Sequence, residues 1–429
     1  MAGCQGDMMK INAEKLFLVI FVVILSAYST YFISPGPDIY AHYAVAKEIL
    51  KDTSIIWRAN LTGWQSFVAI QTSALTNYPP LAYIAFAVLM SVQLPLFLMT
   101  IFCVAAIGYF LYKIDGKSIP FLFMSFMFVR EAAFNGYDII LVAVTLTSFY
   151  FLAKKKIVLS AIFVGMLPLI KSTGLFVVLS WLLYIILFEM GNIFTKRFIV
   201  AIIIALSLSS PFYIRNYLMF HDVLLAVLGI SRETYARGTE FLSSAFQINQ
   251  PERFLWDSTG YYPLPIDILF YVGIVLFAFN LIKTRQIRPY SILIIVMVGA
   301  YFIFQLIGIP FFVIRHEMII FPFLALEIVR GIPEKYLKHS LIICLLFLTW
   351  FSFNLSKYAF NQYSGLLGPT CNQLRTEIGN EPVYVTAFHS WFVIYRCNLN
   401  ATVQADSKWT ADFDKGQLYP TNHTNIAGA

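Results

Sequence analysis

The sequence predicts an all-α polytopic membrane protein with about eleven transmembrane helices. Of its 429 residues, 59% are hydrophobic and only 12% are charged. A soluble protein has about twice that charged fraction, so this chain has too little polar surface to cover a globule. Apolar runs of about 17–25 residues recur nearly from end to end. These runs are continuous rather than alternating, which disfavours membrane-spanning strands.

The first expected element is the apolar run from Leu16 to Ile33, which follows Lys10 and Lys15. This arrangement is similar to a signal peptide, but no small-residue cleavage site follows it. We therefore expect an uncleaved first helix with its N-terminus in the cytoplasm.

Ten further spans are expected, with boundaries accurate to a few residues. They cover residues 95–112, 119–135, 138–153, 157–171, 174–190, 198–214, 262–282, 290–309, 318–330 and 340–356. The run from Pro80 to Leu94 is shorter, and its length suits an external helix at the membrane interface better than a crossing. Counting it as a span would also move the triple lysine at 154–156 to the outside.

The connections between the runs alternate between strongly basic and weakly charged. Together with Lys10 and Lys15, the basic connections hold half of the 30 Lys and Arg residues. Their members are Lys113, Lys117, Lys154, Lys155, Lys156, Lys196, Arg197, Lys283, Arg285, Arg288, Arg330, Lys335 and Lys338. The positive-inside rule assigns them to the cytoplasm. The net charge of +7 is thus a topology signal, and the absence of a basic stripe with interleaved aromatic residues disfavours nucleic acid as a partner.

The other connections then lie on the external side of the membrane, which would be the plasma membrane or that of the endoplasmic reticulum. They include a first external loop with interfacial helices at 34–94, a second loop at 215–261, and a tail. We expect a transmembrane domain at 1–356 and a small external C-terminal domain at 357–429. Three N-glycosylation triplets, beginning at Asn60, Asn400 and Asn422, lie on this side.

The tail has the pattern of a small α/β cap. Residues 382–386 and 401–403 are expected strands, and residues 391–395 an expected helical turn. Such a unit is too small to be robust alone. A disulfide between Cys371 and Cys397 would stabilise it in an oxidising setting, and two free thiols are the alternative.

Asp38 is the leading candidate for a functional residue. It follows the first apolar run and precedes His42 by four residues. An ionisable group is costly to hold at a membrane boundary, which favours a functional role over a charge that merely ends a helix. The other candidate polar residues on the external face are His42, Tyr78, Arg130, Glu131, Asp138, Lys171, Arg215, Arg315, His316 and Glu317.

These residue types suit sugar transfer from a lipid phosphate. Nucleotide-activated donors are made in the cytoplasm, so an external transferase needs a donor that lipid carries. The reaction needs a carboxylate to take a proton from the acceptor hydroxyl, for which Asp38 is the candidate. It also needs cations for the departing phosphate. The candidates for phosphate binding are Arg215, Arg315, Lys171 and Arg130, although each has an alternative reading as a snorkelling helix-end residue.

The histidines His42 and His316 are candidates for orienting the acceptor or the phosphate, and packing is their alternative role. The Tyr78-Pro79-Pro80 turn is expected to fix the entry of the interfacial helix.

At these residues the chain resembles the GT-C superfamily of integral membrane glycosyltransferases, especially the mannosyltransferases that use polyprenyl-phosphate mannose. Pro37-Asp38-Ile39 follows the first helix, Tyr78-Pro79-Pro80-Leu81 closes the first loop, and Asp138 heads the fourth span. Residues 211–216, Pro-Phe-Tyr-Ile-Arg-Asn, are similar to the family's Pro-Trp-Tyr-Ile-Arg-Asn. Arg315-His316-Glu317 followed by Pro322 is similar to its Arg-Tyr-Leu-Leu-Pro segment.

The resemblance implies a GT-C fold and an inverting transferase with Asp38 as base. It implies a polyprenyl- or dolichyl-phosphate donor, mannose as the sugar, and phosphate contacts to Arg215 and Arg315. The acceptor or the interfacial helix would be positioned by Asp138, Tyr78 and Glu317. Members with lipid-monophosphate donors work without metal, so no metal or other cofactor is expected. The acceptor would be a glycan, a glycolipid or a protein hydroxyl.

Three other functions remain open. A transporter or lipid flippase would show inverted repeats and polar groups at midplane depth, and no repeat relates the two halves of this chain. A polymerase or ligase acting on lipid-linked glycans would lack the early aspartate. A structural scaffold would not need cations facing a carboxylate from separate helices.

Overall fold

A computed structural model describes residues 80–133, 138–189, 195–220, 268–306 and 317–337 almost entirely as helices. It also describes residues 23, 43, 45–47, 49–51, 339–340, 342–344, 346, 372 and 374–376, and the strands 383–384, 401–402, 409–412 and 417–420. The helical character expected from the sequence is confirmed for this part of the chain.

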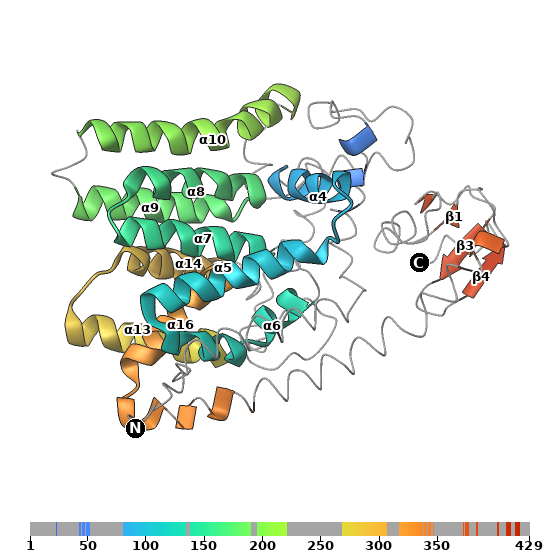
Figure 1. The fold of residues 1–429 in the computed structure, drawn as a ribbon. Coiled ribbons are helices and arrows are strands. Elements are labelled where there is room, and N and C mark those ends of the chain that lie inside the picture. Colours follow the sequence, from blue (N-terminus) through green and yellow to red (C-terminus); the bar gives the residue numbers. More distant parts are fainter. Residues whose placement is uncertain are drawn as a thin grey trace, which may run out of the picture.

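The helices follow the predicted apolar runs closely (Figure 1). Their bounds are α4 Leu81–Ser91, α5 Phe97–Asp115, α6 Phe126–Ala133, α7 Asp138–Ala153, α8 Ile157–Ile170, α9 Gly174–Phe188, α10 Lys196–Phe220, α13 Ile268–Thr284, α14 Pro289–Leu306 and α16 Phe321–Gly331. Two short 3₁₀ helices are η2 Gly116–Met124 and η5 Met318–Ile320. The expected spans 16–33 and 340–356 lie largely outside the described residues.

One predicted span is not a single helix. Residues 119–135 divide into the 3₁₀ helix η2, which contains Pro120, and the short α6. Between them Ser125 is extended, and its Oγ accepts a hydrogen bond from the Phe128 amide at 3.0 Å. Pro120 lacks an amide hydrogen and a serine side chain can cap a helix, so the sequence breaks here.

Two helical stretches in the described part are long and apolar enough to cross a membrane. They are Phe97–Met124 and Lys196–Arg215. Other apolar helices in the described part, among them α4 with 11 residues and α13 with 17, are too short to count as such candidates. The count of about eleven spans therefore remains a proposal.

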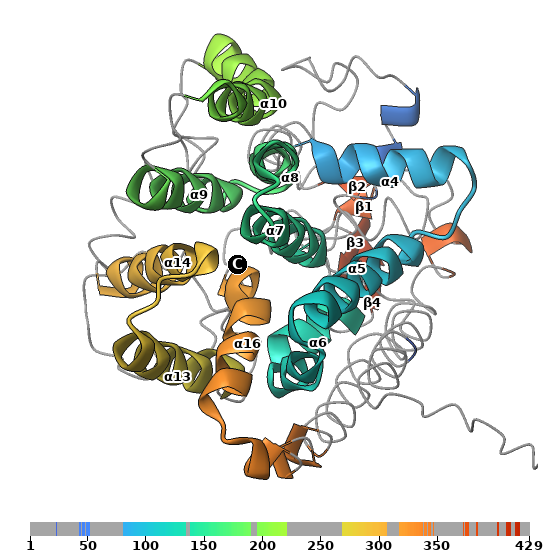
Figure 2. The same ribbon diagram turned by 60° about the vertical axis from the view of Figure 1, so that its left-hand side comes forward.

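The helices pack side by side around α7 (Figure 2). α7 packs against α5 and α8, α8 also packs against α9 and α10, and α13 packs against α16. A polar chain crosses this core, since Trp181 Nε1 donates to Ser160 Oγ at 2.8 Å and Ser148 Oγ donates to the Ser160 carbonyl at 3.1 Å. These bonds satisfy buried polar groups that lipid or apolar side chains could not satisfy.

Aromatic contacts set the register of the helices. Phe323 of α16 lies 5.6 Å from the Phe149 ring of α7 and 5.1 Å from the Tyr290 ring of α14. Phe110 of α5 lies 5.0 Å from the Tyr150 ring of α7. These contacts bring the connections at 115–117, 154–156, 284–288 and 330–336 to one end of the helices, which we call the basic end.

Two of the basic turns close in the same way. Lys155 after α7 and Arg285 after α13 have φ angles of 57° and 52°, a left-handed conformation that ends a helix. The Lys156 amide then donates to the Phe151 carbonyl at 2.9 Å. Short turns of this kind make α7 and α8 antiparallel neighbours.

The C-terminal part contains a four-stranded sheet with the order β2-β1-β3-β4. Its strands are β1 Val383–Tyr384, β2 Ala401–Thr402, β3 Trp409–Asp412 and β4 Gln417–Pro420. β1 is parallel to β2 and β3, and β3 is antiparallel to β4. The first two strands coincide with the expected ones, whereas β3 and β4 were not expected. The turn expected at 391–395, Cys371 and Cys397 lie outside the described residues.

Candidate functional site at the end opposite the basic connections

A buried ion pair lies at the other end of the helices. Lys171 Nζ donates to Asp138 Oδ1 at 2.6 Å, and the two side chains are only 8% and 3% exposed. Asp138 is the first residue of α7, where the helix dipole favours an anion. Lys171 follows the last residue of α8, where the dipole favours a cation. Both local positions therefore suit the charge that they hold.

The turn that carries Lys171 has little room to move. The Lys171 amide donates to the Leu167 carbonyl at 3.1 Å, and the Gly174 amide donates to the Lys171 carbonyl at 2.9 Å. A Cβ on Gly174 would lie 2.4 Å from the Leu167 carbonyl carbon and oxygen. Only glycine permits this approach of α9 to the end of α8, so the turn fixes the backbone from which Lys171 reaches Asp138.

Close packing of α10 on α8 brings Arg215 to the same end. A Cβ on Gly165 would lie 2.8 Å from the Ala205 carbonyl oxygen, so these two helices touch through their backbones. Further along, Tyr213 Oη donates to the Pro168 carbonyl at 3.5 Å. Arg215 and Lys171 lie two and three residues beyond this contact, so both lie near the same end of the α8–α10 pair.

Arg215 is buried and lies beside the interfacial segment. Its side chain is 6% exposed, and it lies within electrostatic reach of Tyr83 in α4. α4 packs against α8 and buries Tyr83 and Phe86. Phe86 also contacts Tyr43, with the ring centroids 5.0 Å apart. α4, which was expected as an interfacial helix within the first external loop, thus packs against α8 and lies near Arg215.

Glu317 is a second buried carboxyl at this end. It is fully buried, and neither carboxyl oxygen has a hydrogen-bond partner among the described residues. Burial raises the pKa of Glu317 well above the usual value for a glutamate.

Of the predicted site residues, the structure thus joins Asp138 and Lys171 in one contact, and it buries Arg215 and Glu317 as well. Glu131, in α6, is also buried. Arg130 lies in the same helix. The remaining predicted site residues, Asp38, His42, Tyr78, Arg315 and His316, lie outside the described residues. Within the described part, no group of three or more His, Cys, Asp and Glu side chains could hold a metal ion.

The pairing of Lys171 changes what this end can do chemically. Asp138 already balances its charge, so an incoming anion would not meet an isolated ammonium group. Arg215 is then the described cation best suited to a phosphate, because a planar guanidinium can donate two parallel hydrogen bonds. The pair itself is suited to holding α7 and α8 in a fixed relation beneath it.

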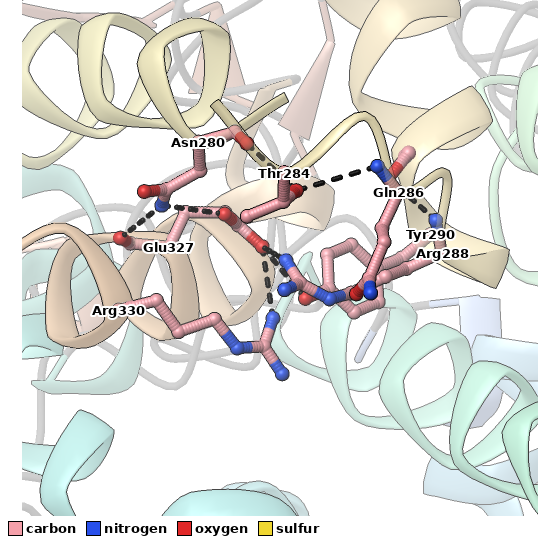
Figure 3. A network of polar contacts seen from close by, with 8 residues as sticks. Asn280, Thr284, Gln286, Arg288, Tyr290, Glu327 and Arg330 are labelled. Atoms are coloured by element: carbon pink, nitrogen blue, oxygen red, sulfur yellow. Dashed lines mark hydrogen bonds and ion pairs between the residues drawn. The ribbon is translucent and has the colours of Figure 1, made fainter. Parts of the chain in front are cut away.

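Sequence reasoning missed a polar cluster at the basic end (Figure 3). Glu327 of α16 is 1% exposed and accepts hydrogen bonds from Arg288, Arg330, Tyr290 and Asn280 at 2.7, 2.8, 2.7 and 2.8 Å. The available signal was an acidic residue inside an apolar run, Phe323-Leu-Ala-Leu-Glu327. From the sequence, only Arg288 and Arg330 are identified, as topology signals.

No protein-family model matches the chain, and a search of curated proteins finds no match to it. The resemblance to the GT-C superfamily therefore rests on the sequence motifs alone.

Proposed function

We propose that the chain is a multi-pass membrane glycosyltransferase of the GT-C type. It moves a sugar, with mannose favoured, from a polyprenyl- or dolichyl-phosphate donor to an acceptor hydroxyl at the face opposite the basic end. The acceptor is a glycan, a glycolipid or a protein. The reaction inverts the anomeric centre and needs no metal.

One observation carries most of the support for this proposal. Asp138 at the start of α7 and Lys171 after α8 form a buried ion pair, and Arg215 of α10 is buried near Tyr83 of α4. Buried charges are costly, so several at one end are better explained by a site than by chance. The basic residues that would act as topology signals gather at the other end.

In the proposed reaction, the acceptor hydroxyl oxygen attacks the anomeric carbon and forms the glycosidic bond. The bond between that carbon and the phosphate oxygen breaks, and its electron pair leaves with the lipid phosphate. Asp38 takes the hydroxyl proton. Arg215 and Arg315 stabilise the departing phosphate, and the Lys171–Asp138 pair positions the helix ends around them.

The test uses the full chain in lipid vesicles with synthetic polyprenyl-phosphate sugars. Asp38→Asn should lower transfer by at least roughly 100-fold, because a positioned general base contributes about that much or more. Asp52→Asn changes another acid of the same predicted loop and should leave the rate near that of the wild type. Full activity of Asp38→Asn would show that Asp38 is not the base.

A second variant addresses the donor phosphate. Arg215→Lys keeps the charge but loses the paired donors, so the KM for the lipid donor should rise more than the KM for the acceptor. An equal rise in both would assign Arg215 to the fold rather than to the donor.

A lipid flippase or transporter is the second candidate, and the buried Asp138–Lys171 pair is the observation that favours it, since paired charges between helices are typical of transport pathways. The vesicle experiment separates the two functions. A flippase would move the sugar lipid across the bilayer unchanged, whereas the transferase would release free polyprenyl phosphate.

A further inference from the structure

Charge is distributed very unevenly between the two ends of the helices. The described cations at the basic end are Lys113, Lys117, Lys154, Lys155, Lys156, Lys196, Arg197, Lys283, Arg285, Arg288, Arg330 and Lys335, and the described acids there are Asp115, Glu189, Glu327 and Glu334. At the opposite end, Lys171 is balanced by Asp138 in the buried ion pair. The basic end therefore has a large surplus of positive charge and suits an anionic partner.

Aromatic rings lie under several of these cations. The ammonium groups of Lys113, Lys154 and Lys283 lie 5.6, 5.9 and 5.7 Å from the ring centroids of Tyr109, Tyr150 and Phe279. Lys335 lies 4.7 Å from the Tyr336 ring. Tyr109, Phe279 and Tyr336 are about half exposed, at 50%, 51% and 51%.

Half-exposed aromatic rings with basic side chains beside them are typical of the level where lipid headgroups meet hydrocarbon. These pairs come from α5, α7, α13 and the segment after α16, so they surround the basic end on several sides. They place this end of the helices at a headgroup layer.

Arg288 and Arg330 are two cations of the basic end that share one buried acid, Glu327 (Figure 3). Both donate through one nitrogen to the same oxygen of Glu327, at 2.7 and 2.8 Å. Arg330 also lies over the Tyr290 ring, 5.6 Å from its centroid. One carboxylate balances only one of the two cations, so the cluster retains a net positive charge.

The two guanidinium groups also retain hydrogen-bonding capacity. A guanidinium carries five N–H donors, and among the described residues each arginine uses one hydrogen bond, on Glu327. Their side chains are 25% and 28% exposed, so the remaining donors are accessible. Two fixed planar forks at a surface are suited to a phosphate group.

A lipid fits this position better than a free phosphate. Ile287, next to Arg288 in the sequence, is 42% exposed, and Ile282, in the last turn of α13, is 78% exposed. Exposed apolar residues in the segment that carries Arg288 would contact acyl chains, whereas a free phosphate would gain nothing from them.

We propose that Arg288 and Arg330 bind the phosphate of an anionic phospholipid in the leaflet that the basic end faces. This site rests on the membrane placement of the chain and is independent of sugar transfer. Lipid in the site would hold α13, α14 and α16 together at that end, because the two arginines connect the loop before α14 to α16.

The experiment measures lipid binding to the purified full chain by native mass spectrometry and needs no sugar donor. The wild type should bind phosphatidylglycerol in preference to phosphatidylcholine. Arg288→Gln should weaken phosphatidylglycerol binding roughly fivefold, the effect expected for one arginine at an anionic surface. Arg285→Gln is the matched control, since Arg285 lies in the same connection and does not contact Glu327 in the described structure.

Arg288→Gln also removes a partner of buried Glu327 and could prevent folding. Arg288→Lys keeps a cation for Glu327 but loses the planar fork, so it should fold and still bind phosphatidylglycerol more weakly than the wild type. Wild-type binding by Arg288→Lys and Arg288→Gln would overturn the site, as would an equal loss in Arg285→Gln. Complete displacement of the lipid by inorganic phosphate at equal concentration would overturn its assignment to lipid.

Discussion

Removal of either partner of the Lys171–Asp138 pair should destabilise the protein strongly. The two atoms are 2.6 Å apart and the side chains are at most 8% exposed. At an effective dielectric constant of about 20, unit charges at this distance attract by about 6 kcal/mol. Desolvation offsets much of that attraction, but a single substitution removes this oppositely charged partner from the other buried charge.

We therefore expect Asp138→Asn or Lys171→Met to lower the free energy of unfolding by about 3–5 kcal/mol each. The double variant removes both charges, so its loss should be well below the sum of the two single losses. The assay is unfolding of the full chain in mixed micelles with an increasing fraction of denaturing detergent, followed by circular dichroism. A double-mutant cycle then gives the coupling free energy between the two side chains.

The matched control is the exposed pair Lys117–Glu334. Its atoms are 3.2 Å apart, and its side chains are 41% and 87% exposed. Lys117→Met and Glu334→Gln should each lower the free energy of unfolding by less than about 1 kcal/mol, because surface ion pairs contribute little to stability. The reasoning from burial is refuted if Asp138→Asn and Lys171→Met lower the free energy of unfolding no more than the control variants do. It is also refuted if the two decreases are simply additive in the double variant.

Two further predictions concern packing and protonation. Gly165→Ala should destabilise the protein by about 1–3 kcal/mol through overpacking, because the new Cβ would lie 2.8 Å from the Ala205 carbonyl oxygen. Gly299→Ala is the control and should not destabilise the protein, because nothing lies within 4 Å of its new Cβ. Equal melting temperatures of the two variants would contradict the close contact at Gly165. The raised pKa of Glu317 means that the folded state holds its proton more tightly than the unfolded state. This stabilisation is complete below the ordinary glutamate pKa of about 4.3 and is lost as the pH rises towards the folded-state pKa, so Tm should fall over that range in the wild type and less in Glu317→Gln. The exposed control Glu334→Gln should keep the wild-type slope, and a wild-type slope in Glu317→Gln would show that Glu317 does not titrate in this way.

Local patterns determined the helices well, as α7 illustrates. Its predicted bounds, 138–153, are those that the structure shows, because an apolar run lies between Asp138 and the triple lysine. Charged residues at both ends of an apolar run are a signal that can be read within twenty residues. The break at Ser125 was missed because a proline at 120 ends α-helical hydrogen bonding without interrupting the apolar run.

The candidate site could be predicted as a set of residue types and not as a set of contacts. Asp138, Lys171 and Arg215 were expected at one face from the alternation of basic connections. Their partners were not, because Lys171 meets Asp138 across 33 positions and Glu327 meets Arg288 across 39. No local signal distinguishes a lysine that forms an ion pair with an acid from a lysine that binds a phosphate.

By itself, the amino-acid sequence determined where most of the described helices lie and which connections are basic, since hydrophobic periodicity and charge act over neighbouring residues. Only the tertiary structure decided which charges neutralise one another, because that depends on helix register. Register in turn is set by contacts such as Gly165 against Ala205 and Phe149 against Phe323. Their geometry depends on how whole helices fit together, and no single helix encodes it.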